Sequence, residues 1–253
     1  MLEEPYRWVE AINNRRDYLQ DQLAGGSPVV GTPYAGGVLL LTTTPGPRKL
    51  FEVYNEMAFA AVGHPADIEK LRKAVIDIAH LEAFNLSAHD ISLQRLVHFG
   101  IGPLMKRAFD EIFRSPYLAR VLVAELDPAH DQECFFSVDA DGSFVSGKEA
   151  AAVSGVAGAQ EDIVDQLQSG TSEASLEDAL SSALEAWARG QLPPLEDGKQ
   201  IHGEGAIREF LSEALSSAKL EAAVLDRTLP TTSKFRLLTA AELEPLTTRH
   251  SGR

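Results

Sequence analysis

The chain has 253 residues, of which 44% are hydrophobic and 24% are charged, a composition typical of a soluble globular protein with a full hydrophobic core. Its 23 basic and 37 acidic residues give a formal charge of −14, which argues against nucleic acid as a partner. The single cysteine, Cys134, excludes an internal disulfide and fits a reducing compartment. The first residues lack the features of a signal peptide, and no apolar run approaches the roughly 18 residues of a spanning helix. We therefore expect a cytoplasmic protein with no membrane partner.

The first predicted element is an amphipathic helix over residues 4–24. Pro5 suits its first turn, and Gly25-Gly26 ends it. The apolar positions that recur at helical spacing are Trp8, Ile12, Leu19 and Leu23.

Four short strands and then two helices follow. Runs rich in Val, Leu, Thr and Ala, separated by Gly and Pro turn signals, predict the strands. Helical periodicity predicts a first helix over 65–84 and a second from a cap at Asp90 to Ile112, with a kink at Pro103. The predicted strands cover residues 29–34, 37–43, 50–54 and 58–62.

The second half repeats this order of strands and then helices. Strand patterns cover 119–125 and 134–138 and return around Phe144, and helical patterns cover 159–168, 176–189 and 206–218. Capping boxes are expected at Ser175 with Asp178 and at Thr239 with Glu242, the latter before a last helix. The final predicted strands cover 220–226 and 234–237.

This order predicts an α+β fold in which two sheets lie between two helical layers, a four-layer αββα sandwich. A doubly wound parallel sheet is excluded, because strands and helices do not alternate singly. We expect one domain over 25–246, preceded by the helical segment 1–24 and followed by a flexible tail over 247–253. Residues 159–218 contain 12 acidic and 3 basic residues, a net charge of −9, and 190–218 has the composition of a variable acidic insertion.

Common catalytic and cofactor signatures are missing. The seven histidines form no His-Glu-x-x-His motif, so we expect no metal site. No Gly-rich phosphate loop and no Gly-x-Ser-x-Gly elbow occurs, so no cofactor is expected. Cys134 lies among apolar and aromatic neighbours in a predicted strand, which favours an inert thiol.

Two stretches carry a specific resemblance. Residues 27–43, SPVVGTPYAGGVLLLTT, and residues 48–63, RKLFEVYNEMAFAAVG, resemble the opening of proteasome core-particle subunits. The likeness consists of a leading hairpin, a lysine before an aliphatic strand, and a small-residue strand that ends in glycine before a long helix. It covers most of the chain and is greatest for the α subunit of bacterial, actinobacterial-type proteasomes. The resemblance implies the αββα fold of the N-terminal nucleophile hydrolases.

Active subunits of this family use an N-terminal threonine, freed by autoprocessing, whose own amine acts as the base. The corresponding position here is on or near Ser27, so the alternative is a self-processing hydrolase that uses Ser27. Three features argue against it: Pro28 follows directly, Thr43 replaces the supporting acid, and an Asp-x-x-Ser-Gly stretch is absent after residue 189.

Other features are shared or favour the noncatalytic subunit. Lys49 and Ser154-Gly155 match the active pattern, but noncatalytic α subunits of the family commonly keep a lysine at this position too. The helix over 4–24 favours an α subunit, because an active subunit must present a free amine after that point. We therefore predict no catalytic residue in this chain.

The resemblance implies a homo-heptameric ring that caps a barrel of proteolytic β subunits and gates substrate entry. Tyr6, Arg7, Trp8 and Ile12 are then the candidate gate and ring-packing residues. Lys49, with Gly63 in the same wall, is the candidate pocket for the C-terminal carboxylate of an AAA+ ATPase activator. Without the resemblance, Lys49 reads as an ordinary surface lysine.

Three classes of function remain open from the sequence. They are a noncatalytic gating subunit, a hydrolase acting from Ser27, and a freestanding binding protein that has borrowed the fold. Self-processing would remove the residues before Ser27, so the intact mass separates the first two. The native mass separates the third, since a monomer has no pore to gate.

Overall fold

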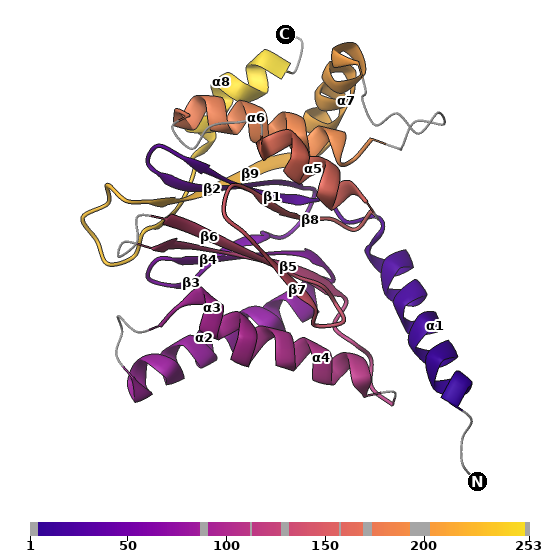
Figure 1. Cartoon of the computed structure of the whole chain (residues 1–253). Helices are drawn as coiled ribbons and strands as arrows, with labels where there is room; N and C mark the ends of the chain where they lie inside the picture. Colours follow the sequence, from indigo (N-terminus) through magenta and orange to yellow (C-terminus); the bar gives the residue numbers. More distant parts are fainter. Residues whose placement is uncertain are drawn as a thin grey trace.

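The computed structural model describes residues 5–86, 91–111, 113–127, 132–156, 158–168, 174–192 and 203–250. Two five-stranded antiparallel sheets are stacked on one another, and helices cover their outer faces (Figure 1). The predicted αββα sandwich is therefore confirmed. Within the described ranges, no helix has both the length and the apolar character needed to cross a membrane.

The first sheet has the strand order β10-β9-β2-β1-β8, and the second has the order β3-β4-β5-β6-β7. The strands of the first sheet are β1 (Val29–Tyr34), β2 (Gly37–Thr44), β8 (Ala151–Val153), β9 (Lys219–Asp226) and β10 (Phe235–Leu237). Those of the second are β3 (Leu50–Tyr54), β4 (Met57–Gly63), β5 (Ala119–Asp127), β6 (Gln132–Val138) and β7 (Phe144–Gly147).

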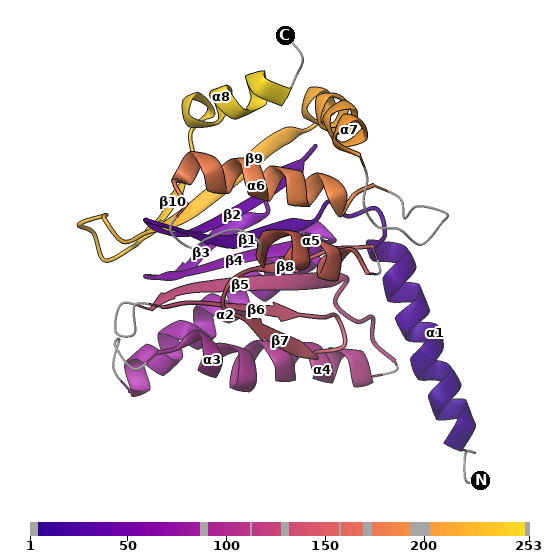
Figure 2. The same cartoon turned by 45° about the horizontal axis from the view of Figure 1, so that its top comes forward.

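Each sheet has its own helical layer. The second sheet is covered by α2 (Pro65–Asn85), α3 (Leu93–Arg95), the π-helix η1 (Leu96–Ile101) and α4 (Gly102–Asp110). The first sheet is covered by α5 (Ala159–Gln168), α6 (Leu176–Arg189), α7 (Glu204–Ser217) and α8 (Ala240–His250). Helix α1 (Pro5–Leu23) belongs to neither layer, and its N-terminal half projects away from the body (Figure 2).

The core consists of three apolar layers that follow from the alternation of side chains along the strands. In β2, Leu39 and Leu41 pack under the helices of the first layer, while Val38 and Leu40 lie between the two sheets. The strand is buried on both faces, which explains why its sequence is a continuous apolar run rather than an alternating one.

Ser175 and Thr239 cap their helices as predicted, and the pair Thr239 and Glu242 forms a full capping box. The Asp178 N–H donates to Ser175 Oγ at 3.2 Å and begins α6. The Glu242 N–H donates to Thr239 Oγ1, and the Thr239 N–H donates to the Glu242 carboxylate at 2.8 Å. These reciprocal bonds satisfy N–H groups that otherwise lack partners at a helix start, so both helices begin within a residue of the predicted position.

Three elements differ from the sequence expectation. The second helix of the first pair is divided into α3, η1 and α4, because Pro103 has no N–H to donate and the turns before it widen to π geometry. Its cap is Ser92, whose hydroxyl accepts from the Arg95 N–H, whereas the expected Asp90 lies outside the described residues. Strand β8 has only three residues and had no local signal of its own.

The C-terminal part is more ordered than expected. Helix α8 runs to His250, so residues 247–250 of the expected flexible tail are helical. In the expected insertion, α7 occupies residues 204–217, close to the predicted helix over 206–218. The rest of the expected insertion, residues 193–202, and the rest of the expected tail, residues 251–253, lie outside the described residues.

Candidate functional site

Lys49 lies just before β3, at one end of the interface between the two sheets. Its side chain is half-buried, and Nζ donates a hydrogen bond to the carbonyl oxygen of Ser27 at 3.1 Å. Ser27 precedes β1 of the first sheet, whereas Lys49 begins β3 of the second. The lysine therefore links the two sheets and places a cation at this end of the sandwich.

A buried carboxylate supports the same segment from the opposite side. Glu221 in β9 accepts from the Lys49 N–H at 3.1 Å and from the Leu50 N–H at 3.3 Å. Burial raises the pKa of Glu221, and the two backbone N–H groups counteract that rise. The carboxylate thus anchors the backbone of β3 and is engaged there rather than with the Lys49 side chain.

Burial of the Lys49 side chain disfavours its charged form. Burial lowers the pKa of Lys49 from 10.5 to about 8, and the charge of Glu221 opposes this only in part. A shift of this size corresponds to about 3 kcal/mol of free energy against the charged form. Within the described part of the chain, no carboxylate lies within ion-pair distance of Nζ, so the ammonium is free to bind an anion.

The Ser27 hydroxyl is held by two neighbours. The indole N–H of Trp187 in α6 donates to Ser27 Oγ at 3.0 Å, and Thr43 Oγ1 lies 3.1 Å from the same oxygen. Neither an indole N–H nor a threonine hydroxyl acts as a general base at neutral pH. Lys49, which is a candidate base by its pKa, bonds the Ser27 carbonyl and not the hydroxyl. Among the described residues, the neighbours of the Ser27 hydroxyl therefore supply no general base, and a base would have to come from an amine freed at Ser27.

Two glycines near Lys49 let neighbouring chain segments pack closely, because they have no side chain. A Cβ at Gly26 would collide with Val62 Cγ1, so the chain before Ser27 packs directly on the end of β4. Gly63, the next residue of β4, has φ +141°, and a Cβ there would collide with the Leu118 carbonyl oxygen. The absence of a side chain at Gly63 thus has a packing reason, and the residue lies at the same end of the second sheet as Lys49.

The C-terminal end of α1 is tightly anchored beside this site. The Gln20 side-chain amide donates to the Gly155 carbonyl at 2.6 Å, and a Cβ at Gly155 would collide with the Leu23 carbonyl oxygen. Arg120 in β5 donates to Gln20 Oε1 at 3.0 Å and to the Ser154 carbonyl at 2.6 Å. Residues 20–24 therefore fill the space against Ser154-Gly155, the pair that matches the pattern of active subunits.

The N-terminal half of α1 is exposed and carries apolar side chains. Trp8 is 50% exposed, Val9 56% and Tyr18 48%, while Ile12 packs partly on the body. Tyr6 and Arg7 lie in the first turns of α1 rather than before it, and their side chains fall outside the described part of the chain. The helix thus presents an unpaired apolar surface.

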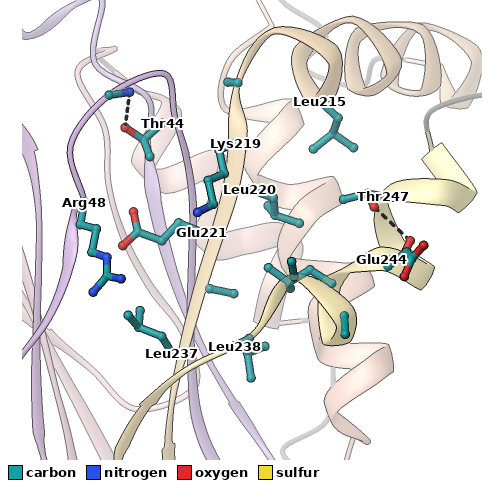
Figure 3. A pocket seen from close by; sticks show the side chains of 16 residues that line it. Thr44, Arg48, Leu215, Lys219, Leu220, Glu221, Leu237, Leu238, Glu244 and Thr247 are labelled. Carbon is teal, nitrogen blue, oxygen red and sulfur yellow. Dashed lines mark hydrogen bonds between the residues drawn. The ribbon is translucent and has the colours of Figure 1, made fainter.

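A cavity of about 670 Å³ lies next to the Lys49 site. It is bounded by β9, the start of α8 and the turn between β2 and β3, with a largely apolar wall that includes Leu237, Leu238 and Leu243. Glu221 and Arg48 lie on one side of it and face each other (Figure 3). Glu221 therefore separates the Lys49 segment from an open, partly apolar hollow.

Sequence reasoning identified Lys49, Gly63 and Ser27 but missed the residues that hold them. Trp187, Glu221 and Arg120 contact the site from positions 34 to 172 residues away along the chain. Glu221 did leave a signal, since it is a single acidic residue inside the buried apolar run Leu220–Leu225. A buried acid in such a strand needs hydrogen-bond donors and therefore indicates a polar site.

The cost of the buried ammonium is measurable. Lys49→Met removes a charge that costs about 3 kcal/mol and a hydrogen bond that contributes about 1 kcal/mol, so we expect the free energy of unfolding at pH 7 to rise by about 2 kcal/mol. The pKa of Lys49 is lower in the folded than in the unfolded protein, so the wild-type chain gains stability between pH 8 and pH 10.5. The advantage of the variant should therefore vanish by pH 10.

Urea unfolding of the two proteins at pH 7 and pH 10 checks this. Arg114→Met serves as the control, because Arg114 is 77% exposed and pairs only with the exposed Glu111 among the described acids, and it should change stability little at either pH. A Lys49→Met chain that is less stable at pH 7 would contradict the electrostatic argument.

The residues that build this site fall within a known family. The sequence pattern of the family described as "Proteasome subunit" matches residues 24–191. Proteins named "Proteasome subunit alpha" from Saccharomonospora viridis, Saccharopolyspora erythraea and Streptomyces coelicolor are 28%, 29% and 27% identical to this chain. Each alignment covers 94% of this chain, and 87%, 84% and 86% of the respective relative. The resemblance to actinobacterial α subunits is thus confirmed, and the chain belongs to the proteasome subunit family.

Proposed function

We propose that this chain is a noncatalytic α subunit of a bacterial proteasome, which forms a heptameric outer ring, admits substrates through a gate and docks an ATPase activator. The observation that carries the proposal is the Lys49 ammonium, a half-buried cation that is held at a cost in stability and has no carboxylate within ion-pair distance among the residues that the structure describes. The similarity to relatives named proteasome subunit alpha over nearly the whole chain supports it.

The surroundings of Ser27 favour a structural over a hydrolytic role. A free amine at Ser27 would require the release of α1, whose C-terminal end is packed on the body. Helix α1 is fixed by Gln20 and Arg120 against Gly155, where a substrate would need space. Thr43 stands next to the Ser27 hydroxyl in place of an acid. We therefore favour the gating subunit over a hydrolase that uses Ser27.

Lys49 has the chemistry of a receptor for a terminal carboxylate. An ammonium is a compact point charge that accepts a carboxylate over a range of directions. Since Nζ bonds only a neutral carbonyl among the described residues, an incoming carboxylate would gain a charge-assisted hydrogen bond without breaking an ion pair. Gly63, at the same end of the second sheet, would form part of the wall, and the bound group would be the C-terminal tail of an AAA+ activator.

Helix α1 supports assembly into a ring. Its exposed apolar residues Trp8 and Val9 lie on the half that projects from the body, where a neighbouring subunit can bury them. A head-to-tail ring of identical subunits uses two different faces of each chain, so a projecting helix on one subunit needs a receiving surface on the next.

The helical layer under the second sheet offers a surface for the β ring. Leu81 and Phe84 in α2 and Phe99 in η1 are 61%, 88% and 73% exposed. The two helices that carry them are in contact, and Arg95 joins them by pairing with Glu82 of α2 and lying over the Phe99 ring. Large exposed apolar side chains gathered on one layer are typical of a protein interface.

The docking role of Lys49 is tested by protein degradation. In a core particle reconstituted with its β subunit and activator, Lys49→Ala should leave assembly and the hydrolysis of small peptides intact. Activator-stimulated degradation of a protein substrate should fall at least tenfold, because a charge-assisted bond contributes roughly 1.5–3 kcal/mol.

Arg114→Ala is the control, since it removes a cation that is 77% exposed and lies outside the Lys49 site. Degradation should be nearly unchanged in this control. Full stimulation in the Lys49→Ala particle would refute the assignment of the pocket.

The same pocket should show a characteristic pH dependence. A carboxylate binds the charged ammonium, and with a pKa of about 8 the charged fraction of Lys49 falls roughly tenfold between pH 7 and pH 9. The affinity for a peptide with the activator's C-terminal sequence should fall by about the same factor. Fluorescence anisotropy of a labelled peptide measures this, with a C-terminally amidated peptide as the control.

Lys49→Arg tests whether Lys49 is the group that titrates, because a guanidinium stays charged between pH 7 and pH 9. The pH dependence should disappear in this variant. An equal loss of affinity in the wild type and in Lys49→Arg would show that another group titrates.

The role of α1 in the ring is tested by Trp8→Glu. A carboxylate in an apolar interface costs several kcal/mol, so we expect rings to give way to smaller species in sedimentation velocity. Asn14→Glu adds the same charge at an exposed polar position of the same helix and should assemble normally. Intact rings of the Trp8→Glu chain with unchanged helix content would place the subunit interface elsewhere.

A further inference from the structure

A second cavity lies in the outer helical layer, away from Lys49. It has a volume of about 480 Å³ and is enclosed by α6, α7 and the C-terminal end of α8. The three helices lie next to one another above the first sheet (Figures 1 and 2). Ile207 and Leu211 of α7 form an apolar part of the wall, and the rest is polar or charged.

The polar wall is dominated by cations. Arg189 comes from α6, Arg208 from α7, and Arg249 and His250 from α8, against the acids Glu185 and Glu204. This is unexpected in a segment, 159–218, whose net charge is −9 and which holds only three basic residues. Two of those three, Arg189 and Arg208, line this one cavity, where they meet Arg249 and His250.

Two nitrogens of this cluster are left without a hydrogen-bond partner among the described residues. They are Arg189 Nε and His250 Nε2, and both are buried from solvent. Buried polar atoms are normally paired, so the cluster has hydrogen-bonding capacity that these residues do not use.

The outer cations are only loosely held. Arg208 lies 4.0 Å from Glu204 and Arg249 lies 3.9 Å from Glu177, and all four side chains are more than 60% exposed. Exposed pairs at these distances contribute little, roughly 0–1 kcal/mol. Both guanidinium groups can therefore turn toward a ligand at little cost.

We propose that this cavity binds a small, multiply charged oxyanion, either a phosphate compound or a polycarboxylate. Arginine matches the planar oxygens of both groups with two parallel hydrogen bonds. Arg208 and Arg249 hold the ligand from α7 and α8, and Arg189 adds positive charge from α6. The Ser181 hydroxyl, which lines the same cavity, adds a neutral donor.

His250 is placed to respond to such a ligand. Burial lowers the pKa of His250, the cations Arg249 and Arg208 lower it further, and Glu185 acts in the opposite direction. An oxyanion in the cavity stabilises the charged imidazole and raises this pKa. The groups that face His250 thus come from α6, α7 and α8, the same three helices that enclose the cavity.

The test uses isothermal titration calorimetry of the full chain with two probes, pyrophosphate and citrate. The double variant Arg208→Gln and Arg249→Gln removes two exposed cations without disturbing the core, and we expect it to weaken binding at least tenfold. Arg114→Gln is the matched control, because Arg114 is 77% exposed and pairs with Glu111 outside the cavity. It should bind as the wild type does.

A second variant works in the opposite direction. Glu185→Gln removes an acid that competes for the cations, so it should strengthen binding about threefold, whereas a merely structural role of the cluster predicts no gain.

Binding of pyrophosphate alone identifies a phosphate site, and binding of citrate alone a carboxylate site. Failure of both probes to bind, or binding that the double variant leaves unchanged, overturns the proposal. Neither result depends on protein degradation, so the outcome is independent of the function proposed for Lys49.

Discussion

Two polar contacts between the sheets determine the chemistry of this subunit. Lys49 Nζ reaches from the start of β3 to the Ser27 carbonyl, and the Glu221 carboxylate reaches from β9 back to the backbone N–H groups of Lys49 and Leu50. Both groups are partly removed from water, so each makes its hydrogen bonds where few alternatives exist. Together they fix β3 against the first sheet and leave a cation at the end of the sandwich. A hydrophobic pair would hold the sheets at lower cost, so stability of the fold alone does not account for the charge.

The position of α1 determines what this cation can do. The end of α1 lies in contact with Gly155 and is held through Gln20 by Arg120, so the space beside Ser27 is filled by the chain itself. A second cationic contact supports the helix, since Arg15 donates to carbonyl groups at the end of α4, including that of Ala108 at 3.0 Å. These contacts fix the C-terminal half of α1, while its N-terminal half projects with Trp8 exposed. One helix thereby fills the space beside Ser27 with its C-terminal half and exposes apolar side chains on its N-terminal half.

The sequence predicted those parts of the fold that depend on local signals. Helices α5 and α6 begin and end at the predicted residues, and Ser175 and Thr239 cap α6 and α8, because caps and periodicity act within a few residues. The π-turn of η1 and the short β8 were not predicted, since the first is an accommodation to Pro103 and the second pairs with β1 through three residues only. The residues that contact Ser27 and Lys49 were not predicted either, because these contacts are not local in the sequence. Trp187 and Glu221 meet the site only after the sheets have stacked, and no pattern within a window of the sequence records that contact.

Helix α7 connects the two sites that we describe. Its apolar face packs on α6, where the Phe210 ring lies 5.9 Å from that of Trp187, the residue whose indole donates to Ser27 Oγ. Its polar face carries Arg208 into the cavity that Arg189 and His250 also line. A ligand that draws Arg208 toward Arg189 would therefore act on α6 and α7 together, and Trp187 lies two residues before Arg189 on the same helix. The buried face of α6 is tightly packed around Trp187, so a ligand held at Arg189 would act on the helix that also supports Ser27. Helix α7 thus adds a charged cavity to the layer that also supports Ser27 and, through its carbonyl, Lys49.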